Sequence, residues 1–174
     1  MPALSGKNIW KAVERATNVA VILGVLLFGV LIYRNYRASR PDGPRTGTTL
    51  PALTGYNWQQ NPRTLVLALR KGCHFCENSM PFYRKLYGLE KTGGLNAGMV
   101  AVFPDSAQDA YAILNTQRLP IPSVSQFNLS RLSVSGTPTL ILVDKNGKVE
   151  KAWVGELDSA GETGVLSAVQ TPSP

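Results

Sequence analysis

An uncharged run near the N-terminus restricts the possible folds of this chain more than any other feature. Residues 16–33 are eighteen consecutive positions without Asp, Glu, Lys or Arg. As an α-helix rising about 1.5 Å per residue, the run spans roughly 27 Å, close to the hydrocarbon core of a bilayer. It has no polar face, which an amphipathic core helix would need. The run therefore predicts a transmembrane helix at residues 16–33 that contacts the lipid bilayer.

A cleaved signal peptide is the main alternative to a retained anchor. The run is longer than a typical signal core, and Arg34 to Arg37, which follow it, contain no small-x-small cleavage site. Trp10 and Tyr33 suit the two membrane interfaces. Basic residues flank both ends of the run, so the positive-inside rule leaves the orientation open. We therefore expect a signal anchor, preceded by a basic flank at residues 1–15.

The net charge of +7 is concentrated around the apolar run. Residues 1–45 carry seven basic and two acidic side chains, whereas residues 46–174 carry eleven and nine. This distribution favours a membrane over nucleic acid as the partner of the basic residues. Residues 34–49, rich in Arg, Pro, Gly and Thr, predict a flexible linker. Its arginines suit either contact with anionic headgroups or a plain solvated tether.

The remainder of the chain, residues 50–170, alternates short apolar runs with helical patterns. Nearly continuous apolar runs predict buried strands at 64–69, 98–103 and 139–143. Helical spacing and start signals predict helices at about 74–89, 104–118 and 157–170. A hairpin turn at 144–147 leads to a returning strand at 148–154. The pattern predicts an α/β sandwich with a mixed sheet, an unassigned loop at 119–135 and a short tail at 171–174.

The only two cysteines, Cys73 and Cys76, follow the first buried strand. Cysteines this close constrain little of the unfolded chain, so we expect a chemical role. At a helix N-terminus, unpaired N–H groups and the helix dipole lower a cysteine pKa from about 8.5 to ~3.5–7.5. Arg70, Lys71 and His74 add positive field at Cys73. The pattern predicts that Cys73 attacks and that the more buried Cys76 resolves the mixed disulfide.

Two other uses of the cysteine pair are compatible with its spacing. A zinc site would require Cys73, His74 and Cys76, but adjacent residues do not easily share one tetrahedral ion, and no second pair completes the set. We therefore predict neither a metal site nor a cofactor. Two buried structural thiols are the other alternative, because free cysteine packs as a small hydrophobic residue.

Three motifs occur together in residues 50–170. They are the cysteine pair, a Met-Pro dipeptide soon after it, and a Gly-Thr-Pro-Thr segment before the third apolar run: Cys73-His74-Phe75-Cys76, Met80-Pro81 and Gly136-Thr137-Pro138-Thr139. An Asp-x-x-Gly turn follows at 144–147. This combination resembles the thioredoxin superfamily, and within it the TlpA/ResA-like membrane-anchored thiol–disulfide oxidoreductases.

The resemblance implies a fold, an activity and a compartment. The fold is a thioredoxin-like three-layer α/β/α sandwich with a mixed sheet, preceded by one transmembrane helix. The activity is disulfide exchange between a redox-active Cys73–Cys76 disulfide and protein thiols or disulfides, with a redox donor or acceptor protein as second partner. Thr137–Pro138 is implied to be a cis peptide in a loop that docks extended substrate segments. The domain is implied to lie on the extracytoplasmic, periplasmic side of the cell membrane.

The chain departs from the thioredoxin pattern at Leu67, at Gly72, which replaces a frequent Trp, and between the cysteines, where Pro is absent. Leu67, six residues before Cys73, stands where thioredoxin has a buried acid that relays protons, so water or Glu77 would have to serve. His74 should stabilise reduced Cys73 and raise the reduction potential, which favours oxidant or isomerase behaviour over that of a strong reductant.

Other functions compatible with the sequence are a peroxiredoxin-like (AhpC/TSA-type) peroxide reductase and a non-enzymatic redox-sensing or copper-handling module. The peroxiredoxin pattern requires Thr or Ser three residues before its reactive cysteine, where this chain has Arg70. In a sensing or copper-handling module the pair would report or bind rather than turn over. An interaction-only domain would leave the placement of the cysteines unexplained.

Overall fold

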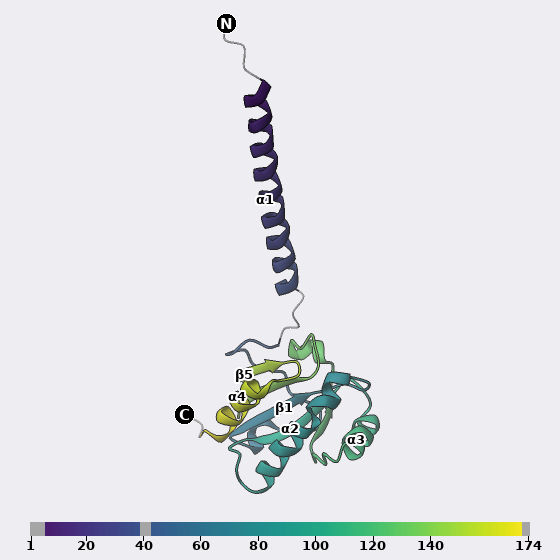
Figure 1. The fold of residues 1–174 in the computed structure, drawn as a ribbon. Helices are drawn as coiled ribbons and strands as arrows, with labels where there is room; N and C mark the ends of the chain where they lie inside the picture. Colours follow the sequence, from purple (N-terminus) through teal and green to yellow (C-terminus); the bar gives the residue numbers. More distant parts are fainter. Residues whose placement is uncertain (1–5, 39–42, 172–174) are drawn as a thin grey trace. The chain divides into compact units, whose positions relative to one another are not determined.

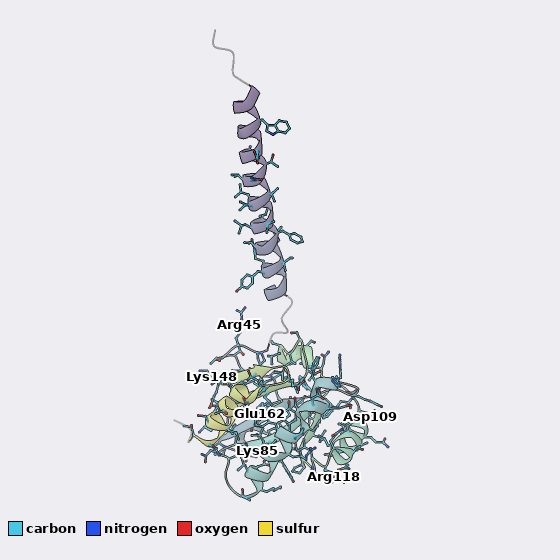
Figure 2. All side chains as sticks on the ribbon, in the orientation of Figure 1. Arg45, Lys85, Asp109, Arg118, Lys148 and Glu162 are labelled. Atoms are coloured by element: carbon cyan, nitrogen blue, oxygen red, sulfur yellow. A yellow bond between two sulfur atoms is a disulfide. The ribbon has the colours of Figure 1, made fainter. Side chains whose placement is uncertain are left out.

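The computed structural model describes residues 6–38 and 43–171, and the chain divides into two units, 1–40 and 41–174. The first unit contains one helix, α1 (Gly6–Ala38). Its segment Ala16–Arg34 has a mean hydropathy of 2.3, and none of that segment is buried (Figures 1 and 2). The predicted run at 16–33 is therefore part of a helix that is long and apolar enough to cross a membrane.

The predicted flexible linker at residues 34–49 differs from the structure. Helix α1 continues to Ala38, since neither Gly nor Pro interrupts the chain between the apolar run and that residue. Residues 39–42 lie outside the described residues. Beyond them the backbone follows the edge of the domain's sheet: the Gly47 N–H donates to Val149 O (2.7 Å), and the Val149 N–H donates to Thr48 O (2.8 Å). Residues 43–49 therefore belong to the second unit, and the backbone of residues 47–49 pairs with the edge of its sheet.

The second unit has one mixed sheet of five strands, in the order β3-β2-β1-β4-β5. The strands are β1 (Arg63–Ala68), β2 (Gly98–Phe103), β3 (Val124–Gln126), β4 (Thr139–Asp144) and β5 (Val149–Val154). β1, β2 and β3 are parallel, and β4 is antiparallel to both β1 and β5. The helices are α2 (His74–Lys91), α3 (Ala107–Thr116) and α4 (Ser159–Gln170), with 3₁₀ turns η1 (Trp58–Gln60) and η2 (Leu129–Leu132).

The two faces of the sheet are covered differently. Leu67 of β1 faces a core to which α2, α3 and α4 all contribute, so the three helices of this unit lie on one face (Figure 1). Val66, the residue before it, faces a second core built from the segment after residue 49, including Trp58, and from Leu132 of η2. The predicted α/β class and mixed sheet are confirmed, but 3₁₀ turns and irregular chain make up the third layer.

The segment that the sequence left unassigned, residues 119–135, contains β3 and η2. β3 adds a three-residue parallel edge strand to β2, with Ala101 opposite Val124. η2 then carries the chain across the second face to β4. The segment therefore completes both the sheet and its second cover.

The register of the central strands brings three separate loops together. Ala68, the last residue of β1, lies opposite Thr139, the first residue of β4. Thr139 in turn lies opposite Val154, the last residue of β5. The loops that adjoin these three strand ends are consequently neighbours, and the cysteine pair lies in the first of them.

Candidate active site

Cys73 is the N-cap residue of α2. Its Sγ accepts a hydrogen bond from the Cys76 N–H (3.2 Å), and its carbonyl oxygen accepts one from the Glu77 N–H (3.1 Å). Gly72, just before it, has φ +67°, a conformation that favours glycine and turns the chain into the helix. The structure therefore places Cys73 at the strand–helix junction that the sequence predicts.

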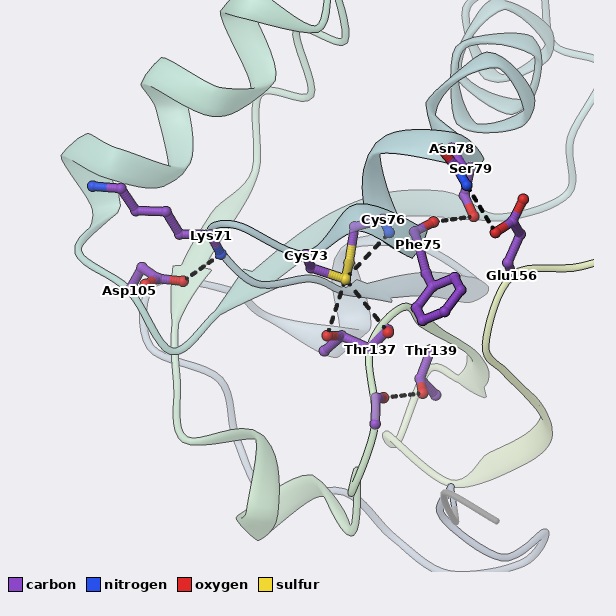
Figure 3. Close-up of a disulfide and its surroundings, with 11 residues drawn as sticks. Lys71, Cys73, Phe75, Cys76, Asn78, Ser79, Asp105, Thr137, Thr139 and Glu156 are labelled. Atoms are coloured by element: carbon purple, nitrogen blue, oxygen red, sulfur yellow. Dashed lines mark hydrogen bonds between the residues drawn. A yellow bond between two sulfur atoms is a disulfide. The ribbon is translucent and has the colours of Figure 1, made fainter. Parts of the chain in front are cut away.

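Cys73 and Cys76 form a disulfide, with their Cα atoms 5.2 Å apart (Figure 3). Cys73 is 7% exposed and Cys76 only 2%, so Cys73 is the more accessible residue of the two. Phe75, between them, is 57% exposed and presents an apolar ring beside the disulfide. An attacking thiolate from outside would therefore reach Cys73 before Cys76.

The loop before β4 faces the disulfide. The Thr137–Pro138 peptide bond is cis. The Thr137 hydroxyl donates to Cys73 Sγ (3.3 Å), and the Thr137 carbonyl oxygen lies 3.4 Å from the same sulfur (Figure 3). The hydroxyl would stabilise a thiolate at Cys73, whereas the carbonyl oxygen would accept the proton of the thiol form. Thr137 can therefore bind Cys73 in either protonation state.

The structure gives Lys71 a different partner from the one predicted. Its ammonium lies 2.8 Å from Asp109 Oδ1, and its backbone N–H donates to Asp105 Oδ2 (2.9 Å). The hydrogen bond and charge of Asp109 raise the pKa of Lys71, while the bond to Lys71 and one to Ser106 lower the pKa of Asp109. The positive field expected from Lys71 at Cys73 is thus largely offset by two carboxylates.

Arg70, unlike Lys71, has no acidic partner among the described residues. Its side chain is exposed and forms no ion pair or hydrogen bond within residues 6–38 and 43–171. Of the two basic residues predicted to act on Cys73 from this loop, Arg70 is therefore the one whose field is not offset by a direct contact.

His74 and Glu77 are both exposed on the first turn of α2. His74 Nε2 lies 3.4 Å from Asn78 Nδ2, and the same Asn78 amide donates to Glu156 Oε2 (3.1 Å) (Figure 3). In the part of the chain that the structure describes, Glu77 has no side-chain bond to either cysteine. The acid joined to this face of α2 by a hydrogen bond is Glu156, which sequence reasoning missed.

Glu156 lies in the loop that follows β5, the third of the three strand ends that meet at the site. It follows Gly155, whose N–H donates to Pro138 O (2.7 Å), so the loop after β5 is bonded directly to the cis-proline loop. A sequence signal exists, because a hairpin turn at 144–147 requires a later residue to return beside the start of β4. The turn alone does not identify which residue returns to the site, because the register of β4 and β5 shifts between Leu142 and Val143.

The interior beside the cysteine pair offers no acid on β1. Leu67 is fully buried in the core that also holds Cys76. Tyr83, on α2, is buried as well, and burial raises the pKa of its hydroxyl, with the Ser79 hydrogen bond opposing and the Glu156 charge adding to that shift. Tyr83 is therefore neutral and does not replace the carboxylate that is missing at Leu67. Within the described residues, no three His, Cys, Asp or Glu side chains are grouped to hold a metal.

No family model and no curated protein sequence matches this chain. Solved structures do resemble it. A thiol:disulfide interchange protein from Bacteroides sp. is 22% identical with a TM-score of 0.56, over 74% of this chain and 92% of its own. The thioredoxin domain of a thiol-disulfide oxidoreductase from Bacteroides vulgatus is 20% identical with a TM-score of 0.54, over 71% and 96%. A thiol-disulfide isomerase from Corynebacterium glutamicum is 12% identical with a TM-score of 0.54, over 76% of this chain and 99% of its own. The domain therefore has the predicted thioredoxin-like fold.

Proposed function

We propose that this protein is a thiol–disulfide oxidoreductase, anchored to the cell membrane by α1, that exchanges disulfides with protein substrates through Cys73 and Cys76. The observation that supports this best is the set of hydrogen bonds around the Cys73 sulfur. Cys73 Sγ accepts the Cys76 N–H at the start of a helix and the Thr137 hydroxyl from the opposite loop, while bonded to Cys76. A thiolate formed there has two donors already in place, which is what a leaving or attacking sulfur needs.

The exchange takes two steps. In the reduced protein the Cys73 thiolate attacks one sulfur of a substrate disulfide, the substrate S–S bond breaks, and the other substrate sulfur leaves as a thiolate. Cys76, once deprotonated, attacks Cys73 Sγ, releases the second substrate thiolate and closes the Cys73–Cys76 disulfide. The substrate gains two electrons and the protein loses two. From the disulfide form the same steps run in reverse, and a substrate dithiol is oxidised.

The other predicted residues take supporting roles. His74 and Arg70 contribute positive field to Cys73, Lys71 contributes little because of Asp109, and Thr137–Pro138 docks the substrate chain. Water removes the Cys76 proton, since the structure gives Glu77 no link to that thiol. The domain lies on the extracytoplasmic, periplasmic side, where disulfides persist, and a second redox protein restores the pair after each cycle.

The proposed function is tested by trapping substrates in cells with Cys76→Ser. Without Cys76 the mixed disulfide at Cys73 is not resolved, so covalent adducts should accumulate and disappear on reduction. Non-reducing electrophoresis followed by mass spectrometry would identify them, with Cys73→Ser/Cys76→Ser as the matched control. Absence of any reductant-sensitive adduct beyond the control would contradict the proposal.

The position of His74 leads to a smaller prediction about the reduction potential. The His74 imidazole on the first turn of α2 would stabilise the Cys73 thiolate when it is protonated, and hence the reduced form, so the potential should lie above that of thioredoxin, about −270 mV. Because His74 is exposed, His74→Ala should lower the potential by only about 10–20 mV. Equilibration with glutathione buffers measures this shift, and Lys85→Ala, farther along α2, is the control. A wild-type value near that of thioredoxin would refute the prediction.

A further inference from the structure

A groove adjoins the cysteine pair on the side of the cis-proline loop. It encloses about 300 Å³ and is lined by Arg70, Pro104, Asn128 and Leu129 and by the loop 134–137. Thr137, at one end of this lining, also contacts Cys73 Sγ through its hydroxyl and carbonyl oxygens. A chain segment lying in the groove would therefore pass directly beside the accessible sulfur.

Arg70 is the only charged side chain that lines this groove in the described part of the chain. Two acids at this end of the sheet contact the neighbouring Lys71, because Asp105 accepts the Lys71 N–H and Asp109 binds the Lys71 ammonium. Arg70 itself makes no ion pair there. The groove thus presents one guanidinium that has no direct ion-pair partner, close to the disulfide.

The opposite side of the cysteine pair carries the opposite charge. Glu156 lies there, held by the Asn78 amide of α2 and attached through Gly155 to the far end of the cis-proline loop (Figure 3). Arg70 and Glu156 therefore flank Cys73 with charges of opposite sign. Of these two side chains, only Arg70 can form an ion pair with an acidic side chain of a substrate segment laid across the site.

We propose that Arg70 is a specificity-determining residue, which selects protein segments that carry an acidic side chain within two or three residues of their reactive cysteine. This inference rests on the proposed function. A guanidinium binds a carboxylate through two parallel hydrogen bonds, and an acid placed in the groove would bring the neighbouring substrate sulfur to Cys73. An exposed pair of this kind changes rates modestly, by about fivefold at low salt, and added salt screens it.

The test uses the reduced full-length protein in an uncharged detergent and two synthetic peptides. Each peptide carries one cysteine as its thiopyridyl disulfide, and the two differ only in Asp or Lys two residues from that cysteine, placed on either side in separate pairs. Attack by the Cys73 thiolate on the peptide sulfur releases pyridinethione, whose absorbance gives the rate constant. The Asp peptide should react about fivefold faster than its Lys counterpart in at least one of the two placements, and 0.5 M NaCl should abolish most of that ratio.

Arg70→Glu should invert the ratio of the two rates, and Lys85→Glu provides the matched control. Lys85 is exposed on α2, nine residues and about 14 Å along the helix from Cys76, and its replacement changes the net charge equally. The inference fails if both peptides react equally with the wild-type protein, or if Lys85→Glu changes the ratio as much as Arg70→Glu. If neither peptide reacts faster with the wild-type protein than with Cys73→Ser, the proposed function itself fails.

Discussion

Replacing Cys73 with serine is expected to reduce thiol–disulfide exchange by the purified protein to the uncatalysed rate. Cys76 does not take over the attack, because it is 2% exposed and packs in the core with Leu67 and Met80. The serine hydroxyl at position 73 would keep the N-cap of α2, so the fold should be retained. Reduction of a protein disulfide, followed by the appearance of its free thiols, measures the loss.

Cys76→Ser should give a different result in the same assay. The Cys73 thiolate can still attack, so one equivalent of substrate thiol should appear in a rapid first phase and then stop, because nothing resolves the mixed disulfide. Circular dichroism of both variants controls for folding. Equal residual turnover in the two variants would contradict the unequal roles assigned from exposure and from the N-cap position of Cys73.

The part of the fold that follows from local pattern was predictable. β1, β2 and β4 are buried on both faces, so their residues form nearly continuous apolar runs that stand out in the sequence. The junction at Cys73 was predictable for the same reason, because a buried strand ends a few residues before a helical pattern begins. The cis-proline loop followed from a resemblance rather than from physics, since an X–Pro bond is cis in only about 5–6% of cases in folded proteins.

The remaining features depend on contacts between distant residues. β3 is only three residues long, and two of the three are polar, so its place beside β2 leaves no periodic signal. Lys71 lies next to the cysteines in sequence, but its charge is offset by Asp109, 38 positions away, because α3 begins beside the end of β1. Glu156 was missed because the bulge between β4 and β5 changes which residue returns to the site. The spacing of residues in the sequence therefore could not predict which charged side chains act on the cysteine pair.

The flexible linker expected at residues 34–49 differs from the structure for a related reason. Its Arg, Pro, Gly and Thr content is typical of a flexible tether, yet the backbone of residues 47–49 pairs with Val149, the first residue of β5, and with Lys148 just before it. An exposed sheet edge accepts almost any extended segment, because the bonds use backbone atoms and not side chains. Composition describes side chains, so it does not detect this kind of attachment.

Arg63→Ala is expected to destabilise the domain by about 2–3 kcal/mol. Arg63, the first residue of β1, is 5% exposed and binds Glu150 Oε2 through Nη2 (2.7 Å) and Nε (2.9 Å), and Thr171 O through Nη1 (2.7 Å). It therefore connects β1 with β5, on the far side of β4, and with the chain just after α4. The substitution would leave the Glu150 carboxylate without its partner in a largely buried position. Because Glu150 is 27% exposed, the cost should fall below that of a fully buried pair.

A double variant separates the cost of an unpaired charge from the worth of the pair. Arg63→Met/Glu150→Leu removes both charges and fills the space with apolar groups, which for buried pairs is often nearly neutral. It should therefore recover most of the stability lost in Arg63→Ala, to within about 1 kcal/mol of the wild-type protein. Urea denaturation of the full chain in detergent, followed by tryptophan fluorescence, to which the buried Trp58 contributes, gives the free energies of unfolding. A double variant as unstable as Arg63→Ala would mean that the ion pair itself, and the bond to Thr171, stabilise the junction of β1, β5 and α4.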